Sequence, residues 1–229
     1  MKTKQRVSFF IGFLLVTAGI NAQPEVGSLF FTPHVGFNVS TLLGHTNVRV
    51  QYVWDDGLGA ASNSQTLPKL GISGGLGLEY QMKKKWALSV GIAANELGVR
   101  FRDFTFEDHT MSNAYIHLFY SNLPILVKYY VNDWLVLGVG LQPGYMLSKK
   151  ANADFSRGGG YTVSSSADDY HRFDLSVPLS VSVNSAERMF YELRCNLGIC
   201  NLMQGDWIPF LPTCLNESIT LAVGYRFRL

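Results

Sequence analysis

The sequence contains little charge and little cysteine. Charged residues make up 16% of the 229 positions, and there are three cysteines. With 47% hydrophobic residues, this composition excludes a disordered polymer, and the length suits one domain. After residue 22 the chain also lacks an apolar run of the roughly 20 residues that a membrane-spanning helix requires. Glycine, with 22 residues, and aromatic residues, at 13%, are plentiful, and this favours β structure over a helical enzyme.

The start of the chain has the features of a secretory signal peptide. Three basic residues precede an apolar stretch from Phe9 to Ala18, and small residues precede a cleavage point after Ala22. Residues 1–22 are therefore expected to be the signal peptide and residues 23–229 the mature domain. An N-terminal anchor is the alternative, but the apolar stretch is short for a span. Cleavage lowers the nominal charge from +2 to −1, which leaves no basic surplus for nucleic acid.

Eight segments of the mature chain alternate apolar and polar residues with period two, which is typical of strands with two different faces. In the third segment the phase changes near Ala94 to Glu96, and this predicts a β-bulge. In the fourth, Pro124 interrupts the pattern. The segments are Leu29 to Thr41, Leu70 to Met82, the stretch that starts at Trp86, Tyr115 to Tyr130, Trp134 to Ser148, Arg172 to Val183, Tyr191 to Ile199, and Ser218 to Leu229.

The connections between these segments alternate between long and short. An exported chain can enter a membrane with strands only as a closed barrel, because unpaired backbone groups are not tolerated in hydrocarbon. We therefore predict an all-β fold: an eight-stranded antiparallel up-and-down transmembrane β-barrel with short periplasmic turns and long extracellular loops. The long connections are 42–69, 102–114, 149–170 and 201–216, and the short ones are Lys83 to Lys85, Val131 to Asp133 and Ser185 to Arg188.

Alternation alone does not show which face meets lipid, since a secreted soluble lipocalin-type ligand-binding barrel alternates too. Three features favour the outer-membrane barrel. The polar faces are rich in glycine and in charges of both signs, and the apolar faces run unbroken. Aromatic residues also gather at the short-turn ends, where they are expected to form an interfacial girdle. These residues are Tyr80, Trp86, Tyr129, Trp134, Tyr225 and Phe227.

Several short motifs carry a family resemblance. LPILVKYY at residues 123–130 is followed by LGVGLQPGY at 137–145, then by YELRCNLGICNL at 191–202 and a terminal GYRFRL. In these motifs the chain resembles the PorT-like outer-membrane β-barrel family of Gram-negative bacteria, over essentially the whole mature sequence. The resemblance implies an eight-stranded outer-membrane barrel, and for some members a link to protein secretion. One departure is the final Leu229, where many such barrels end in an aromatic residue; Phe227 supplies that residue two positions earlier.

Charged residues on the polar faces are expected to point into the barrel. An eight-stranded barrel is only wide enough to be filled by its own side chains. Charges of both signs should therefore pair into a structural plug, and we expect low conductance; a narrow ion path or a lumen site is the alternative. The expected network comprises Glu79, Lys128, Arg172, Asp174, Glu192, Arg194, Arg226 and Arg228.

No catalytic, cofactor or metal site is predicted. The five histidines lack ligand spacing such as HExxH, and the sequence contains no GxSxG or CxxC motif. An outer-membrane barrel enzyme remains an alternative. It would need a cluster at the barrel rim, such as His109 with Asp108 or His171 with Asp169. The favoured interpretation is a non-enzymatic structural or interaction protein.

The cysteines and the connections give two further expectations. An exported protein with three cysteines can form one internal disulfide, and Cys200 and Cys214 enclose the last long loop. They are a candidate pair, while Cys195 is expected on the lipid side. The expected partners are outer-membrane lipid and a protein that binds the extracellular loops or the periplasmic turns, with no nucleic acid.

Overall fold

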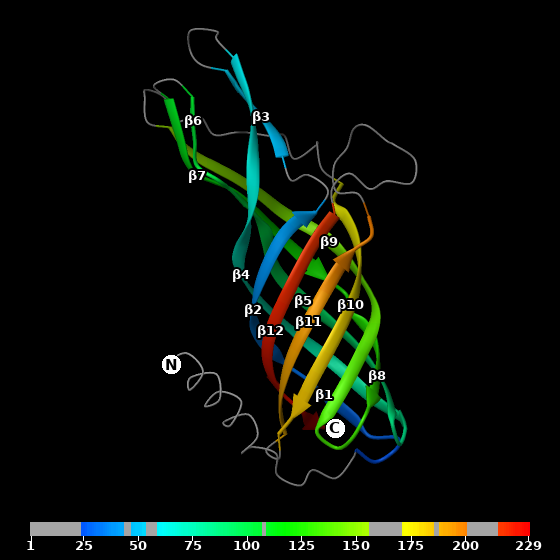
Figure 1. Cartoon of the computed structure of the whole chain (residues 1–229). Coiled ribbons are helices and arrows are strands. Elements are labelled where there is room, and N and C mark those ends of the chain that lie inside the picture. Colours follow the sequence, from blue (N-terminus) through cyan, green and yellow to red (C-terminus); the bar gives the residue numbers. More distant parts are fainter. Residues whose placement is uncertain are drawn as a thin grey trace, which may run out of the picture.

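A computed structural model describes residues 24–43, 47–53, 59–106, 109–155, 171–185, 188–200 and 215–229. The predicted signal peptide and Cys214 lie outside these residues. The described elements are strands that join into one antiparallel sheet, and the sheet curves into a barrel (Figure 1). Within the described residues, no helix is long and apolar enough to cross a membrane.

The first crossing of the barrel wall closes the sheet. It consists of β1 (Leu29–Phe31) and β2 (His34–Leu43), which pair with β4 (Gly59–Lys83) on one side. On the other side they pair with β12 (Leu215–Tyr225) and β13 (Phe227–Arg228). Chain neighbours then pair around the ring, so the predicted eight-stranded antiparallel barrel is confirmed. The remaining wall strands are β5 (Trp86–Phe101), β7 (His109–Asn122), β8 (Ile125–Tyr130), β9 (Leu135–Phe155), β10 (Phe173–Asn184) and β11 (Met189–Gly198).

Prolines divide two of the eight crossings into two elements. Pro33 separates β1 from β2, and Pro124 separates β7 from β8. Proline has no backbone N–H to donate to the ladder, so regular pairing stops at each of them. The crossing continues on both sides, because β7 and β8 pair with the same neighbours, β5 and β9.

The two faces of the wall have opposite chemistry. The apolar positions face outward, where Leu70 is 75% exposed and Phe37 is 72% exposed in the absence of lipid. The polar positions face inward: Gln81 is 0% and Asn38 is 1% exposed. A soluble lipocalin-type barrel would have the reverse arrangement, with its apolar side chains around an internal ligand. The outward apolar face is that of a transmembrane barrel.

Several strands are longer than the alternation predicts. β4 begins at Gly59 rather than near Leu70, and β9 ends at Phe155 rather than near Ser148. β3 (Asn47–Val53) and β6 (Phe104–Phe106) lie within connections predicted as loops, and they pair with β4 and β7. Figure 1 shows these hairpins projecting beyond the barrel at the end opposite the C-terminus. Outside the bilayer no lipid imposes period two, so the strands continue without that pattern.

The predicted bulge lies in a different strand. The sequence placed it in β5 near Ala94 to Glu96, but β5 pairs with β7 without a break from Ala93 to Arg100. The irregularity lies instead in β4, where Pro68 is opposite Val99 and Ser73 is opposite Asn95. Between these pairs β4 has one residue more than β5. Such an extra residue is a β-bulge, and it interrupts the hydrogen-bond ladder between the two strands.

Candidate functional site

The interior of the barrel is the candidate site, because alternation directs the polar side chains of all eight crossings into it. Near the short turns, Glu79 of β4 lies at the centre of this interior, and it is 2% exposed. Its carboxylate accepts hydrogen bonds from Lys128 Nζ at 2.7 Å and from Arg226 at 2.8 Å. The hydroxyl of Tyr130 donates to the same carboxylate at 2.5 Å. Two cations and a phenol from other parts of the wall thus converge on one acidic group.

Aromatic rings enclose this ionic cluster. The guanidinium carbon of Arg226 lies 4.4 Å from the centre of the Phe30 ring, and Arg226 also donates to the Tyr130 hydroxyl at 2.8 Å. Lys128 Nζ lies 5.8 Å from the centre of the Phe190 ring. Cations above ring faces gain electrostatic stabilisation in addition to their ion pairs. The cluster therefore joins β1, β4, β8 and β11 across the lumen and fills it at this level.

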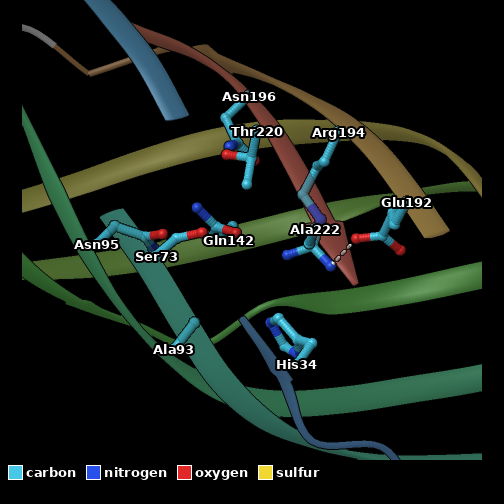
Figure 2. A pocket seen from close by; sticks show the side chains of 10 residues that line it. All are labelled: His34, Ser73, Ala93, Asn95, Gln142, Glu192, Arg194, Asn196, Thr220 and Ala222. Atoms are coloured by element: carbon cyan, nitrogen blue, oxygen red, sulfur yellow. Dashed lines mark ion pairs between the residues drawn. The ribbon is translucent and has the colours of Figure 1, made fainter. Parts of the chain in front are cut away.

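A second ion pair and a small polar cavity lie further along the lumen. Glu192 and Arg194, both on β11, form an ion pair, and Ser182 Oγ donates to Glu192 at 3.1 Å. Figure 2 shows this pair on one side of the cavity, with Asn95 and Ser73 on the other side. The space holds about one water molecule. The cavity is lined by His34, Ser73, Ala93, Asn95, Gln142, Glu192, Arg194, Asn196, Thr220 and Ala222.

Hydrogen bonds between short polar side chains continue towards the outer end. Asn196 donates to Ser218 Oγ at 3.0 Å, Asn216 donates to Asp174 at 3.3 Å, and Asn95 donates to Asn122 at 2.8 Å. Each bond joins residues on different strands. Several other buried polar atoms, including Ser73 Oγ and Asn196 Oδ1, have no hydrogen-bond partner among the described residues. The middle of the lumen is therefore polar and only partly paired within the protein.

An apolar cluster, which was not predicted from the sequence, fills the outer end of the barrel interior. Its members come from β2, β5, β7 and β9, and Val99 and Leu118 are both 0% exposed. On β5 the odd-numbered side chains from Ala87 onwards point inward, and Leu97 and Val99 are two of them. Extending this alternation past Glu96 would therefore have predicted both residues inside the barrel. Ser40 of β2 strengthens this closure, since its hydroxyl both donates to the Gly98 carbonyl and accepts from the Gly98 N–H at 2.9 Å. The cluster comprises Leu42, Leu97, Val99, Leu118, Tyr120 and Met146.

Two residues of the expected lumen network lie elsewhere. Arg172 precedes β10 and is exposed. The side chain of Arg228 is 54% exposed and forms an ion pair at 2.6 Å with Glu25, which is also exposed. Both residues occur at the ends of crossings, where the wall no longer encloses a side chain. The other six expected residues are inside, grouped around Glu79, around Glu192 and at Asp174.

The expected interfacial aromatics lie on the outer surface near the short turns. The Trp86 and Tyr129 rings are 4.9 Å apart, and the Tyr225 and Phe227 rings are 4.6 Å apart. Tyr80 is 47% exposed and Trp134 is 41% exposed. This arrangement is that of an aromatic girdle at a membrane interface.

The remaining sequence candidates supply little additional chemistry. The two described cysteines, Cys195 and Cys200, are not joined to each other, and Cys214 lies outside the described residues. The pairing of Cys200 with Cys214 therefore stays a prediction. Asp108 and Asp169, the expected partners of the rim histidines, also lie outside. Within the described ranges, no group of three or more His, Cys, Asp or Glu residues is suited to hold a metal ion.

Comparison with known proteins identifies a family. Residues 18–204 match the family model described as "Outer membrane protein beta-barrel domain". No protein among those with curated descriptions matches the chain.

Similar solved structures are outer-membrane proteins of low sequence identity. The attachment invasion locus protein Ail of Yersinia pestis is 12% identical, with a TM-score of 0.42 over 89% of this chain and 100% of that one. OprG from Pseudomonas aeruginosa is also 12% identical, with a TM-score of 0.42 over 91% of this chain and 100% of that one. Neisserial surface protein A is 8% identical, with a TM-score of 0.36 over 87% of this chain and 97% of that one.

Proposed function

The chain belongs to the outer membrane protein β-barrel domain family, and on this basis we propose that it is a non-enzymatic structural or interaction protein of the bacterial outer membrane. The protein is a barrel with an apolar outer wall in that membrane. Within this role, the barrel holds its extended strands in place at the outer surface and does not conduct ions or solutes.

The observation that supports this proposal is the filled lumen. Near the short turns, Glu79 joins Lys128, Tyr130 and Arg226 across the interior. At the outer end, the apolar cluster around Leu118 fills the same interior. The polar cavity between them holds about one water molecule. A solute would have to displace both groups of side chains to pass.

The strands that extend beyond the wall support a binding role. The β3–β4 hairpin and the sheet formed by β6, β7 and the end of β9 project from the outer end (Figure 1). Loops and strand ends on a rigid scaffold commonly carry binding residues. We propose a protein partner at this end, with the periplasmic turns as a second contact region. The motifs that resemble the PorT-like family extend the proposal to secretion-related assembly.

Conductance measurements test the closed lumen. Purified full-length protein, first shown to be folded by a change of electrophoretic mobility on heating, is inserted into planar lipid bilayers. We expect no steady channel, because the lumen is closed at two levels. Steady channels of large conductance in the folded protein would contradict the proposal.

Photo-crosslinking in cells tests the binding role. A photoreactive residue at Asn152, which is exposed on the extended part of β9, is expected to crosslink a protein. A matched position on the lipid-facing wall, Leu76, is expected to crosslink no protein. Equal protein crosslinking at the two sites would contradict a specific outer contact. Deletion of this protein should also lower the amount of other proteins exported to the cell surface. Unchanged export would contradict the secretion-related role.

A further inference from the structure

The turn between β4 and β5 carries three adjacent cations. Lys83, Lys84 and Lys85 are all exposed. Among the described residues, none of the three forms an ion pair with a carboxylate, in contrast to Lys69 and Lys128. The next short turn along the chain, Val131 to Asp133, contains an aspartate and no lysine. Three adjacent exposed cations therefore lie at this turn, whereas the described part of the third short turn has one, Arg188.

The turn is held in place by hydrogen bonds to the barrel wall. Gln81 is 0% exposed, and its side-chain amide donates to the Lys83 carbonyl at 2.8 Å and to the Lys84 carbonyl at 3.4 Å. On the other side, the Tyr130 N–H donates to the Lys85 carbonyl at 2.9 Å. The backbone of the three lysines is therefore fixed to the wall on both sides. A fixed backbone presents the three ammonium groups together and reduces the entropy lost when they bind a ligand.

Aromatic side chains place this turn at the membrane interface. Trp86 directly follows Lys85 and packs on Tyr129, and Lys85 Nζ lies 5.9 Å from the centre of the Tyr129 ring. Tyr80 is half-exposed on the same strand as Lys83. Exposed tryptophan and tyrosine rings on a membrane barrel lie at the level of the lipid headgroups. The lysine side chains, which extend from the same level, therefore reach the phosphate layer.

We propose that this basic turn patch, defined by Lys83, Lys84 and Lys85 with Tyr80, Trp86 and Tyr129, binds the phosphate headgroups of anionic phospholipids in the periplasmic leaflet. The ammonium groups pair with the phosphates while the aromatic rings pack against the glycerol and upper acyl region. A lipid is favoured over an acidic protein because the cations stand beside rings that face the bilayer. The contact ties β4, β5 and β8 to the leaflet on one side of the barrel.

Lipid selectivity measurements test this site. The full-length protein is reconstituted into vesicles of phosphatidylcholine that contain traces of spin-labelled phosphatidylglycerol or spin-labelled phosphatidylcholine. We expect the native protein to retain the labelled phosphatidylglycerol preferentially in its lipid shell. The variant Lys83→Gln/Lys84→Gln/Lys85→Gln should lose affinity by about fivefold for each lysine that contacts a headgroup. The preference should also weaken as salt is added.

The charge-conserving variant Lys83→Arg/Lys84→Arg/Lys85→Arg is the matched control and should keep the preference. Mobility shifts on heating check that both variants fold. An unchanged phosphatidylglycerol preference in the glutamine variant would overturn the proposal. So would a photoreactive residue at position 84 of the otherwise native chain that crosslinks a periplasmic protein and no lipid, because the patch would then be a protein contact.

Discussion

The two ends of the barrel interior are filled by different chemistry. Near the short turns, one carboxylate, Glu79, holds two cations and a phenol in a space with almost no exposure. At the outer end, Leu97, Leu118 and their neighbours pack without charge. Removing one member of a buried ionic group leaves its partners uncompensated, whereas removing part of an apolar side chain leaves only a cavity. The ionic end should therefore depend more strongly on each of its members.

The largest expected effect is that of Glu79→Ala. Lys128 and Arg226 would be left buried without a counter-charge, and we expect the free energy of unfolding to fall by about 3–5 kcal/mol. Urea titration of the protein folded in lipid vesicles measures this value. The double variant Glu79→Gln/Lys128→Met should lose less than the sum of its single substitutions, because it removes both charges of one pair. A loss below about 0.5 kcal/mol in Glu79→Ala, the range of ordinary surface substitutions, would show that the cluster does not stabilise the barrel.

Leu118→Ala tests the apolar end. The substitution leaves a cavity among fully buried side chains, and we expect a loss of about 2–5 kcal/mol in the same titration. Leu78→Ala is the matched control, because Leu78 faces outward at 48% exposure and lipid can fill the space left behind. Leu118→Ala should also remain non-conducting, since the Glu79 cluster still closes the lumen. A new conductance in this variant would show that the apolar cluster is the only barrier.

Gly98→Ala tests how the apolar end is closed. Gly98 has a φ of +142°, and an added Cβ would overlap the Ile116 carbonyl oxygen. We expect a loss of about 1–3 kcal/mol from backbone strain. Gly74→Ala should be nearly neutral, because its Cβ would meet its nearest neighbour, the His34 carbonyl oxygen, at an ordinary 3.6 Å. Equal unfolding free energies for the two variants would contradict a special role for Gly98.

The smallest expected effect is that of Arg228→Gln. Its ion pair with Glu25 is exposed on both sides, so the free energy of unfolding should fall by less than about 1 kcal/mol. Arg226, two positions earlier, pairs with buried Glu79, and Arg226→Gln should cost several times more. Unfolding titrations of the two variants side by side make this comparison. Equal losses of unfolding free energy in the two variants would contradict the prediction that the buried ion pair of Arg226 stabilises the barrel more than the exposed pair of Arg228.

Much of the wall could be predicted from the sequence because lipid and lumen impose opposite chemistry on alternate residues. The same principle explains what was missed. The extension of β4 from Leu70 back to Gly59 lies where lipid no longer selects apolar residues. Arg172 and Arg228 alternate like lumen residues but sit at the ends of crossings, where the wall no longer encloses them.

Within the lumen, the sequence indicated the members but not their pairing. Glu79 meets Lys128 and Arg226, which are 49 and 147 positions away along the chain. Such contacts depend on the register between strands and on the closure of the ring, and alternation specifies neither. The apolar cluster was missed for another reason: inward leucines such as Leu97 and Leu118 resemble outward ones when only hydrophobicity is read.

The length of β4 has a consequence for where a partner can bind. A tilted strand needs roughly 9–11 residues to cross the hydrocarbon, and β4 has 25. At about 3.3 Å per residue, the surplus of roughly 15 residues carries the start of β4 at Gly59 on the order of 50 Å along the strand direction past the bilayer. The proposed protein partner can therefore contact the outer end of β4 without approaching the lipid.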